Sequence, residues 1–124
     1  MNDNKNDVYA ELHSITETEA KKIVEEIPDG SSLESLSELF RALGDLTKVK
    51  IIYLLSRKEM CVHDLATLLE ASQSSVSHHL KTLKLNDLVK ARREGKAVYY
   101  SLDDPHVEGL FTQCIDHVDH KVSG

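Results

Sequence analysis

The segment Val62–Leu85, VHDLATLLEASQSSVSHHLKTLKL, decides the fold. Its apolar residues recur at helical spacing in two runs, which predicts a short helix starting near His63 and a second helix from about Ser74 to Leu85. Glu70-Ala71-Ser72 forms the turn between them. Two short helices around a tight turn are typical of a helix-turn-helix. In the second helix, the residues expected to face the core are Val76, Leu80 and Leu83.

A β-hairpin is expected directly after these two helices. Leu88–Ala91 and Ala97–Leu102 have the composition of strands, and Arg92–Lys96 links them. Gly95 in this link permits the positive φ that a hairpin turn needs. A hairpin in this place is a wing, so the pattern predicts a winged helix-turn-helix.

Further helices are expected on both sides of the winged unit. Ser32 can cap one of them, and Asp104-Pro105 starts the last one, because Asp is a good N-cap and Pro favours the first helical position. The fold class is therefore mainly α with a small β-hairpin (α+β). We expect residues 1–15 to be a flexible N-terminal segment and residues 16–124 to form one domain. The flanking helices are expected at about 16–28, 32–43, 47–56 and 104–120.

Composition narrows the function classes. The 124 residues are 40% hydrophobic and 29% charged, as in ordinary globular domains. No stretch approaches the roughly 20 apolar residues that span a bilayer, and Met1–Asp7 lacks the apolar core of a signal peptide, so a cytoplasmic protein without a membrane partner is expected. The two cysteines are far apart, which argues against a disulfide framework.

The charge is unevenly distributed along the chain. The net charge is −6, yet residues 72–100 hold six Lys and Arg side chains against two acidic ones, Asp87 and Glu94. Phosphate contact requires a local basic patch rather than a basic total. The position of this patch, over the second helix and the wing, favours double-stranded DNA as a partner.

The start of the second helix carries short polar side chains that suit a major groove. Gln, Ser and His side chains can bond base edges, and Lys can bond phosphate. The alternative is a solvated helix N-terminus with ordinary capping serines. The basic wing that follows favours the DNA interpretation. The expected DNA contacts are Gln73, Ser74, Ser77, His78, Lys81, Arg92, Arg93 and Lys96.

The last helix carries the pattern Asp104-x-His106 and His117-x-x-His120, four residues of zinc-ligand type. His106 and His117 share a face but lie roughly 16 Å apart along one helix, too far to bind one ion. Two antiparallel copies of the helix would bring Asp104 and His106 of one chain to the His117 and His120 positions of the other. The alternative is a polar helix end with histidines by chance. The spacing favours a homodimer with two intersubunit metal sites.

A weaker cluster consists of Cys61, His63 and Asp64, with His13 as a further contributor. A thiolate with His or Asp can hold a soft or borderline ion. The favoured alternative is that Cys61 packs and His63 or Asp64 caps a helix. Cys114 is expected in the core or an interface.

The chain resembles the ArsR/SmtB family of metal-responsive repressors, and within it the zinc sensors of the CzrA and SmtB type. The resemblance implies a homodimer joined through its N- and C-terminal helices, with the Asp104, His106, His117 and His120 set as a zinc site. It further implies repression of a metal efflux or sequestration gene that zinc relieves, and a relay from His117 to the backbone near Asp87. Co(II) and Ni(II) accept the same ligands. The residues that carry the resemblance are EMCVHDLA (59–66), SQSSVSHHL (72–80), GKAVYYSL (95–102) and the four metal-ligand positions.

Two other functions compete with a zinc-responsive repressor. The cadmium- and lead-sensing members have a Cys-x-Cys at the first helix of the motif and earlier cysteines, whereas here position 63 is His and no cysteine precedes Cys61. A repressor of the same fold could instead respond to thiol oxidation at Cys61 or Cys114. A zinc hydrolase would need an open metal position, a base and a pocket, which a closed four-ligand site does not provide, so no enzyme activity is expected.

Overall fold

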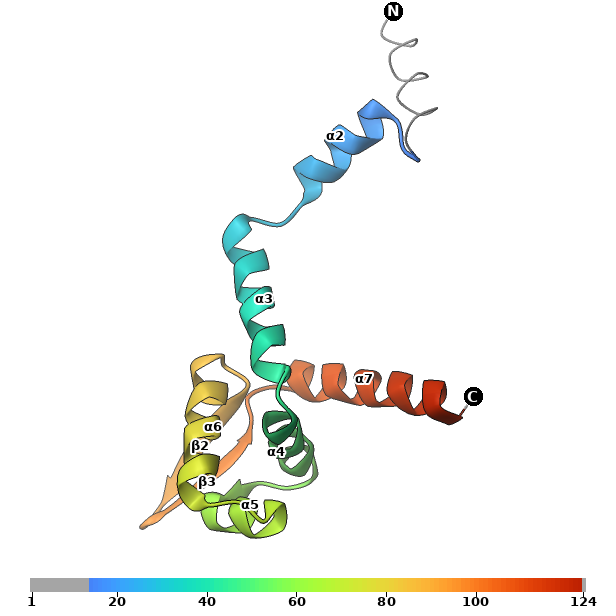
Figure 1. Ribbon diagram of the computed structural model, residues 1–124. Helices are drawn as coiled ribbons and strands as arrows, with labels where there is room; N and C mark the ends of the chain where they lie inside the picture. The colour runs from blue at the N-terminus through green and yellow to red at the C-terminus, as the bar shows by residue number, and fades with distance from the viewer. Residues whose placement is uncertain (1–13, 124) are drawn as a thin grey trace, which may run out of the picture. The chain divides into compact units, whose positions relative to one another are not determined.

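The computed structural model describes residues 14–123, with side chains described for residues 14–120. The chain divides into two compact units, Met1–Leu36 and Ser37–Gly124. Helices dominate and the one sheet is small and antiparallel, which confirms the α+β class (Figure 1). The flexible segment predicted for residues 1–15 lies mostly outside the described residues. The elements are α2 (Glu17–Glu26), α3 (Gly30–Leu43), α4 (Leu46–Arg57), β1 (Met60–Cys61), α5 (Val62–Leu69), α6 (Gln73–Leu85), β2 (Val89–Glu94), β3 (Ala97–Leu102) and α7 (Pro105–Ser123).

In the N-terminal unit, α2 begins with a capping box. The Thr16 hydroxyl accepts a hydrogen bond from the Glu19 backbone N–H, and the Glu19 carboxylate accepts one from the Thr16 N–H, both at 3.1 Å. The next helix, α3, starts two residues earlier than expected. Asp29 accepts bonds from the Ser31 backbone and hydroxyl, at 3.1 and 3.0 Å, so Asp29 rather than Ser32 holds the helix start.

The second unit contains the helix-turn-helix. Asp45 caps α4 through the Lys48 N–H at 3.0 Å, and Ser72 caps α6 through the Ser75 N–H at 3.1 Å. In contrast, α5 starts at Val62 after Cys61, whose side chain makes no capping hydrogen bond. The expectation that His63 or Asp64 caps this helix is wrong, because both lie inside its first turn.

The core confirms the sequence-based assignment of the inner face of α6. Val76, Leu80 and Leu83 are 0% exposed. Burying aliphatic side chains of this size stabilises the fold by about 1.5–3 kcal/mol each, so this face fixes how α6 sits on the unit. The other buried core residues are Ala42, Ile51, Ile52, Leu55, Leu65, Ala66, Leu88 and Val89.

Both helices of the motif are followed, within two residues, by a non-glycine residue in the left-handed conformation. Glu70 has φ 54° and follows α5, and Asp87 has φ 56° and follows α6. At the first site, Ala71 N–H bonds Ala66 O at 3.0 Å and Glu70 N–H bonds Thr67 O at 3.3 Å. This pair of bonds is a Schellman motif, which turns the chain sharply from α5 toward α6.

The wing belongs to a three-stranded antiparallel sheet with the order β1-β3-β2. The sequence did not predict β1, which is only two residues long and pairs Met60 with Tyr100. The hairpin turn is also shorter than expected: Glu94 pairs with Ala97, which leaves two residues in the loop. Gly95 at the first loop position has φ 61°, as the sequence predicted.

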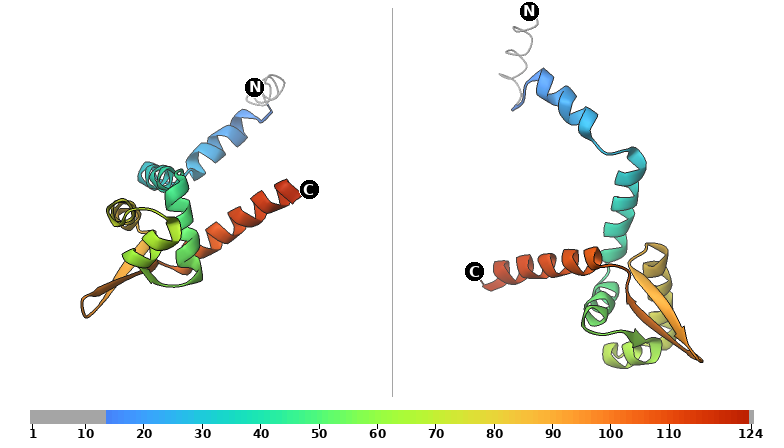
Figure 2. Two further views of the ribbon diagram at one scale, coloured as in Figure 1. Left: turned by 60° about the horizontal axis from the view of Figure 1, so that its bottom comes forward. Right: turned by 180° about the vertical axis from the view of Figure 1, so that it is seen from behind.

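The last helix, α7, contacts α4 and β3 near its start and then extends beyond them (Figures 1 and 2). Val107 and Phe111 pack against the core from this first part of the helix. Within residues 14–123, no helix combines the length and the hydropathy that a membrane crossing needs.

Candidate functional site

The outer face of α6 presents a set of polar side chains. The fully buried face of this helix holds it against the unit, so the opposite face is free to meet a ligand. One contact ties this face to α5: Gln73 Nε2 lies 3.2 Å from His63 Nδ1. The structure therefore brings together five of the residues expected to contact DNA, and all five are exposed: Gln73, Ser74, Ser77, His78 and Lys81.

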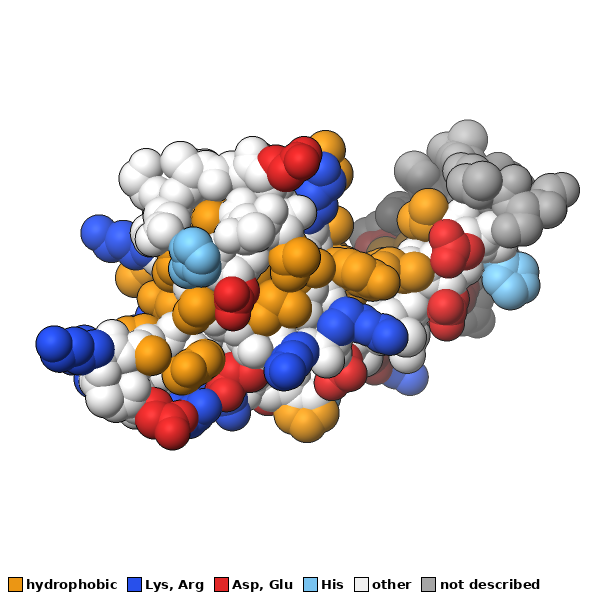
Figure 3. Space-filling view, turned by 90° about the horizontal axis from the view of Figure 1, so that it is seen from below, with side chains coloured by type: hydrophobic (Ala, Val, Ile, Leu, Met, Phe, Trp, Pro, Cys, Tyr) orange, Lys and Arg blue, Asp and Glu red, His pale blue; other side chains and the backbone are white. Residues whose placement is uncertain are grey.

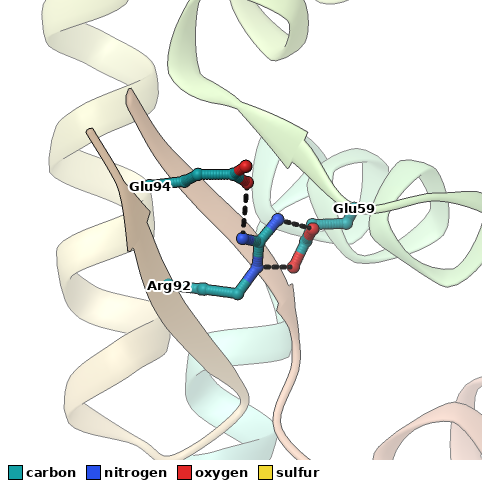
Figure 4. A network of polar contacts seen from close by, with 3 residues as sticks. All are labelled: Glu59, Arg92 and Glu94. Carbon is teal, nitrogen blue, oxygen red and sulfur yellow. Dashed lines mark hydrogen bonds and ion pairs between the residues drawn. The ribbon is translucent and has the colours of Figure 1, made fainter. Parts of the chain in front are cut away.

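The wing presents basic side chains beside this helix. Arg93 and Lys96 are exposed, and Figure 3 shows Lys and Arg side chains at the outer end of the molecule on the left, where the hairpin turns. Arg92 differs from them. Its guanidinium hydrogen-bonds Glu59 at 2.7 and 3.3 Å and Glu94 at 2.7 Å (Figure 4). The bonds to Glu59 and then Glu94 raise the pKa of Arg92, and the bond from Arg92 lowers the pKa of Glu59.

The start of α7 brings together two of the four expected metal ligands. Asp104 Oδ1 accepts hydrogen bonds from the backbone N–H of His106 at 2.8 Å and of Val107 at 3.2 Å. The same oxygen lies 3.4 Å from His106 Nδ1. The backbone N–H groups of Val107 and then His106 hold the pKa of Asp104 below its ordinary value. The carboxylate is therefore ionised at neutral pH and stands beside an imidazole that is 96% exposed.

The other two expected ligands, His117 and His120, are exposed near the far end of α7. His117 lies eleven positions after His106, or roughly 16 Å along the axis. Among the described residues of the single chain, no group of three or more His, Cys, Asp or Glu side chains could hold a metal ion. The four residues thus form two separate pairs, one at each end of the helix.

An apolar stripe runs along α7 between these two pairs. Together with α3 and α4 it lines an open groove of about 920 Å³. Val118 in this stripe is 55% exposed and Leu110 is 36% exposed. Figure 3 shows hydrophobic side chains gathered over the middle of the face in view. At about 100° per residue, His106 and His117 lie roughly a quarter turn from the centre of the stripe, and His120 lies further round the helix. The stripe consists of Val107, Leu110, Phe111, Cys114, Ile115 and Val118.

The weaker cluster is only partly assembled. Cys61 is half-buried, and His63 and Asp64 are exposed in the first turn of α5. These three side chains form no metal-holding group among residues 14–120. The expected contributor His13 lies outside the described residues, so the second metal site stays a prediction. Cys61 and Cys114 are free thiols.

The expected relay joins His117 to the backbone near Asp87. Asp87 lies two residues after the end of α6, in the left-handed conformation, and lines the same groove as Asp104 and His106. No hydrogen bond between His117 and Asp87 is found among the described residues of the single chain, so the relay also stays a prediction.

Sequence reasoning missed Glu59. This residue lies 33 positions from Arg92 and just before β1. A two-residue strand is too short to show the alternation that marks a strand. No local sequence signal marks the pairing of Cys61 with Tyr99, which places Glu59 and Arg92 on the same side of the sheet.

Comparison with known proteins identifies the family. The family described as "Bacterial regulatory protein, arsR family" matches residues 45–91, which contain the helix-turn-helix. A transcriptional repressor SmtB homolog of Synechocystis is 38% identical over 103 residues, covering 83% of this chain and 78% of the relative. The chain therefore belongs to the arsR family of bacterial regulatory proteins, as the sequence motifs indicated.

Two further relatives support this assignment. A cadmium resistance regulatory protein, a CadC homolog of Staphylococcus aureus, is 48% identical over 83 residues, covering 66% of this chain and 69% of the relative. A homodimeric winged helix-turn-helix DNA-binding domain from Mycobacterium bovis superposes with a TM-score of 0.72 at 29% identity, covering 74% of this chain and 85% of that one. The protein is thus a transcriptional regulator of this family, and its relatives include named repressors and a homodimeric DNA-binding domain.

Proposed function

We propose that the protein binds its operator as a homodimer and releases it when Zn(II) binds between the two C-terminal helices. The single observation that carries this proposal is the position of the four ligands, in two pairs at opposite ends of α7, with the apolar stripe between them. Derepression of a metal efflux or sequestration gene follows from this response. The site of action is the bacterial cytoplasm, where the operator is, and the protein catalyses no reaction.

In the proposed DNA complex, α6 enters the major groove and the wing lies along the backbone. The exposed polar face of α6 suits base edges, and the exposed Arg93 and Lys96 suit phosphates. A two-fold dimer would place its two recognition helices in successive major grooves, about 34 Å apart. The angle between the two subunits therefore decides whether both helices can bind at once.

The dimer seam is proposed to form from the α7 stripes of two chains. The exposed part of this stripe, Leu110, Cys114 and Val118, continues beyond the core contacts of Val107 and Phe111, and a two-fold partner would cover it with the same stripe. In an antiparallel pair, Asp104 and His106 of one chain would meet the partner's His117 and the partner's His120. This arrangement gives each ion three nitrogen ligands and one carboxylate.

The ligand chemistry argues for zinc over cadmium. The relatives include an SmtB homolog and a CadC homolog, so similarity alone does not decide the metal. The proposed site contains imidazole and carboxylate, which suit Zn(II) in a tetrahedral site. Soft ions prefer thiolates, and the whole chain has only two cysteines. Co(II) and Ni(II) accept the same ligands and are proposed as secondary effectors.

A mixed dimer tests whether each site is shared. One chain carries His106→Ala and the other carries His117→Ala, with separable tags to isolate the heterodimer. If the sites are shared, one site loses both altered histidines and the other keeps all four ligands. The heterodimer should then bind one zinc ion tightly, as measured by competition with a chelating dye.

The two homodimers are the matched controls, since each carries two damaged sites and should bind no zinc tightly. If the heterodimer also lacks an intact site, the ligands come from a single chain and the antiparallel seam is wrong.

A further inference from the structure

The Glu59–Arg92 ion pair crosses the whole sheet of the wing. Arg92 lies on β2, directly opposite Tyr99 on the middle strand β3. Its guanidinium carbon lies 5.0 Å from the centre of the Tyr99 ring. The guanidinium group reaches Glu59, which precedes β1 (Figure 4). The two outer strands do not pair with each other, so this contact joins opposite edges of the sheet.

The geometry of this contact is unusually well defined for a surface ion pair. Both Glu59 oxygens accept bonds from Arg92, one from Nη2 and one from Nε. Such a bidentate pairing fixes the orientation of the guanidinium plane as well as its position. Nη1 bonds Glu94 on the same strand, and the ring of Tyr99 lies beneath. The charge of Arg92 is thus shared by two carboxylates and is poorly available to a DNA phosphate.

The location of Glu59 gives the pair a mechanical role. Two residues of β1 separate Glu59 from α5, the first helix of the helix-turn-helix. Arg92 lies three residues before Gly95, at the turn of the wing. The pair therefore ties the outer part of the hairpin to the segment that leads into the DNA-reading helices.

We infer that Arg92 is a positioning residue, held by Glu59, which sets the angle of the wing relative to the recognition helix α6 for DNA binding. This inference rests on the proposed DNA-binding mode. It assigns the phosphate contacts of the wing to Arg93 and Lys96 and removes Arg92 from them. The Glu59 carboxylate then assists DNA binding although it carries the same sign of charge as DNA.

The sign of the Glu59→Ala effect tests the inference. Loss of a negative charge near DNA, or release of Arg92 to reach a phosphate, would tighten binding. Loss of a positioning contact weakens it instead, by about three- to tenfold, which lies in the lower part of the coupling range found between residues in contact. The probe is a duplex selected by the wild-type protein from random sequences, and affinity is measured by fluorescence anisotropy over a series of salt concentrations.

Glu94→Ala is the matched control. It removes a carboxylate of the same charge from the same guanidinium, but one whose bond stays within β2. The affinity of Glu94→Ala for the selected duplex should equal or exceed that of the wild type. Arg92→Ala should weaken binding as Glu59→Ala does, with an unchanged salt slope. The slope would fall by about one if Arg92 contacted a phosphate.

The charge swap Glu59→Arg with Arg92→Glu, made in the Glu94→Ala background so that two carboxylates do not meet on β2, gives the strictest readout. Restoring the pair in reverse should recover affinity to within about twofold of the wild type if position matters, because residues in one contact couple non-additively. Tighter binding of Glu59→Ala, or a swap weaker than Arg92→Ala, would overturn the inference. Melting curves of each variant at one protein concentration confirm folding. If the wild type selected no duplex at all, the proposed function would fail rather than the role of Arg92.

Discussion

The turn between the two DNA-reading helices contains a strained residue whose replacement should stabilise the protein. Glu70 has φ 54° and ψ 43°, in the left-handed region. A side chain costs about 1–2 kcal/mol there, because Cβ crowds the following carbonyl oxygen. Glycine avoids this cost, but its unfolded state has about 0.5–1 kcal/mol more backbone entropy to lose. Glu70→Gly should therefore stabilise each chain by about 0.5–1 kcal/mol.

The assay is thermal unfolding followed by circular dichroism. For a chain of this length, the expected gain is an increase of about 2–4 °C in Tm. Protein concentration must be equal in all samples, because dimer formation makes Tm depend on it. Glu70→Ala is the control, since it removes the same carboxylate and keeps Cβ. A Glu70→Gly variant no more stable than Glu70→Ala would refute the assignment of strain to this position.

Two further predictions separate DNA reading from metal sensing. Ser77→Ala should weaken binding to the selected operator by about 1–3 kcal/mol and leave binding to unrelated duplexes unchanged. Lys96→Ala should weaken binding to both kinds of duplex and lower the salt slope by about one. If Ser77→Ala weakened binding to both duplexes equally, Ser77 would not read bases. His117→Ala should bind operator as the wild type does and no longer release it with zinc in a gel-shift assay, because the residue is exposed on α7, outside the polar face of α6. If His117→Ala instead failed to bind operator even with no metal added, the metal would be needed for folding.

The elements that sequence predicted well are those with a strong local pattern. Val76, Leu80 and Leu83 recur at helical spacing, and all three are fully buried. Gly95 marked the hairpin turn because a positive φ favours glycine. In contrast, β1 has only two residues, and its pairing with Tyr99 and Tyr100 depends on contacts about 40 residues away. Local periodicity carries no record of such a partner.

The functional site also has a part that the sequence predicted and a part that it did not. The exposed face of α6 was predictable, because on a helix the residues that face the core determine which residues face the solvent. The partners of Arg92 did not follow, since an arginine in a basic run has the same sequence signature whether it contacts a phosphate or a glutamate. The metal ligands are a third case. The spacing of His106 and His117 can be read from the sequence of one chain, but the proposed metal site requires two chains.

The proposed coupling between metal binding and DNA binding requires a difference in binding free energy as well as a suitable geometry. A zinc ion that bound equally well to both dimer shapes would shift nothing, however tight the binding. Release requires a preference of a few kcal/mol for the shape that misfits DNA, at about 1.4 kcal/mol for each tenfold change in operator affinity. The start of α7 suits this role, because Asp104 and His106 adjoin Val107, which packs against the core. A change in the seam would then be passed to the helices that read DNA. By reciprocity, operator DNA must weaken zinc binding by the same factor by which zinc weakens DNA binding.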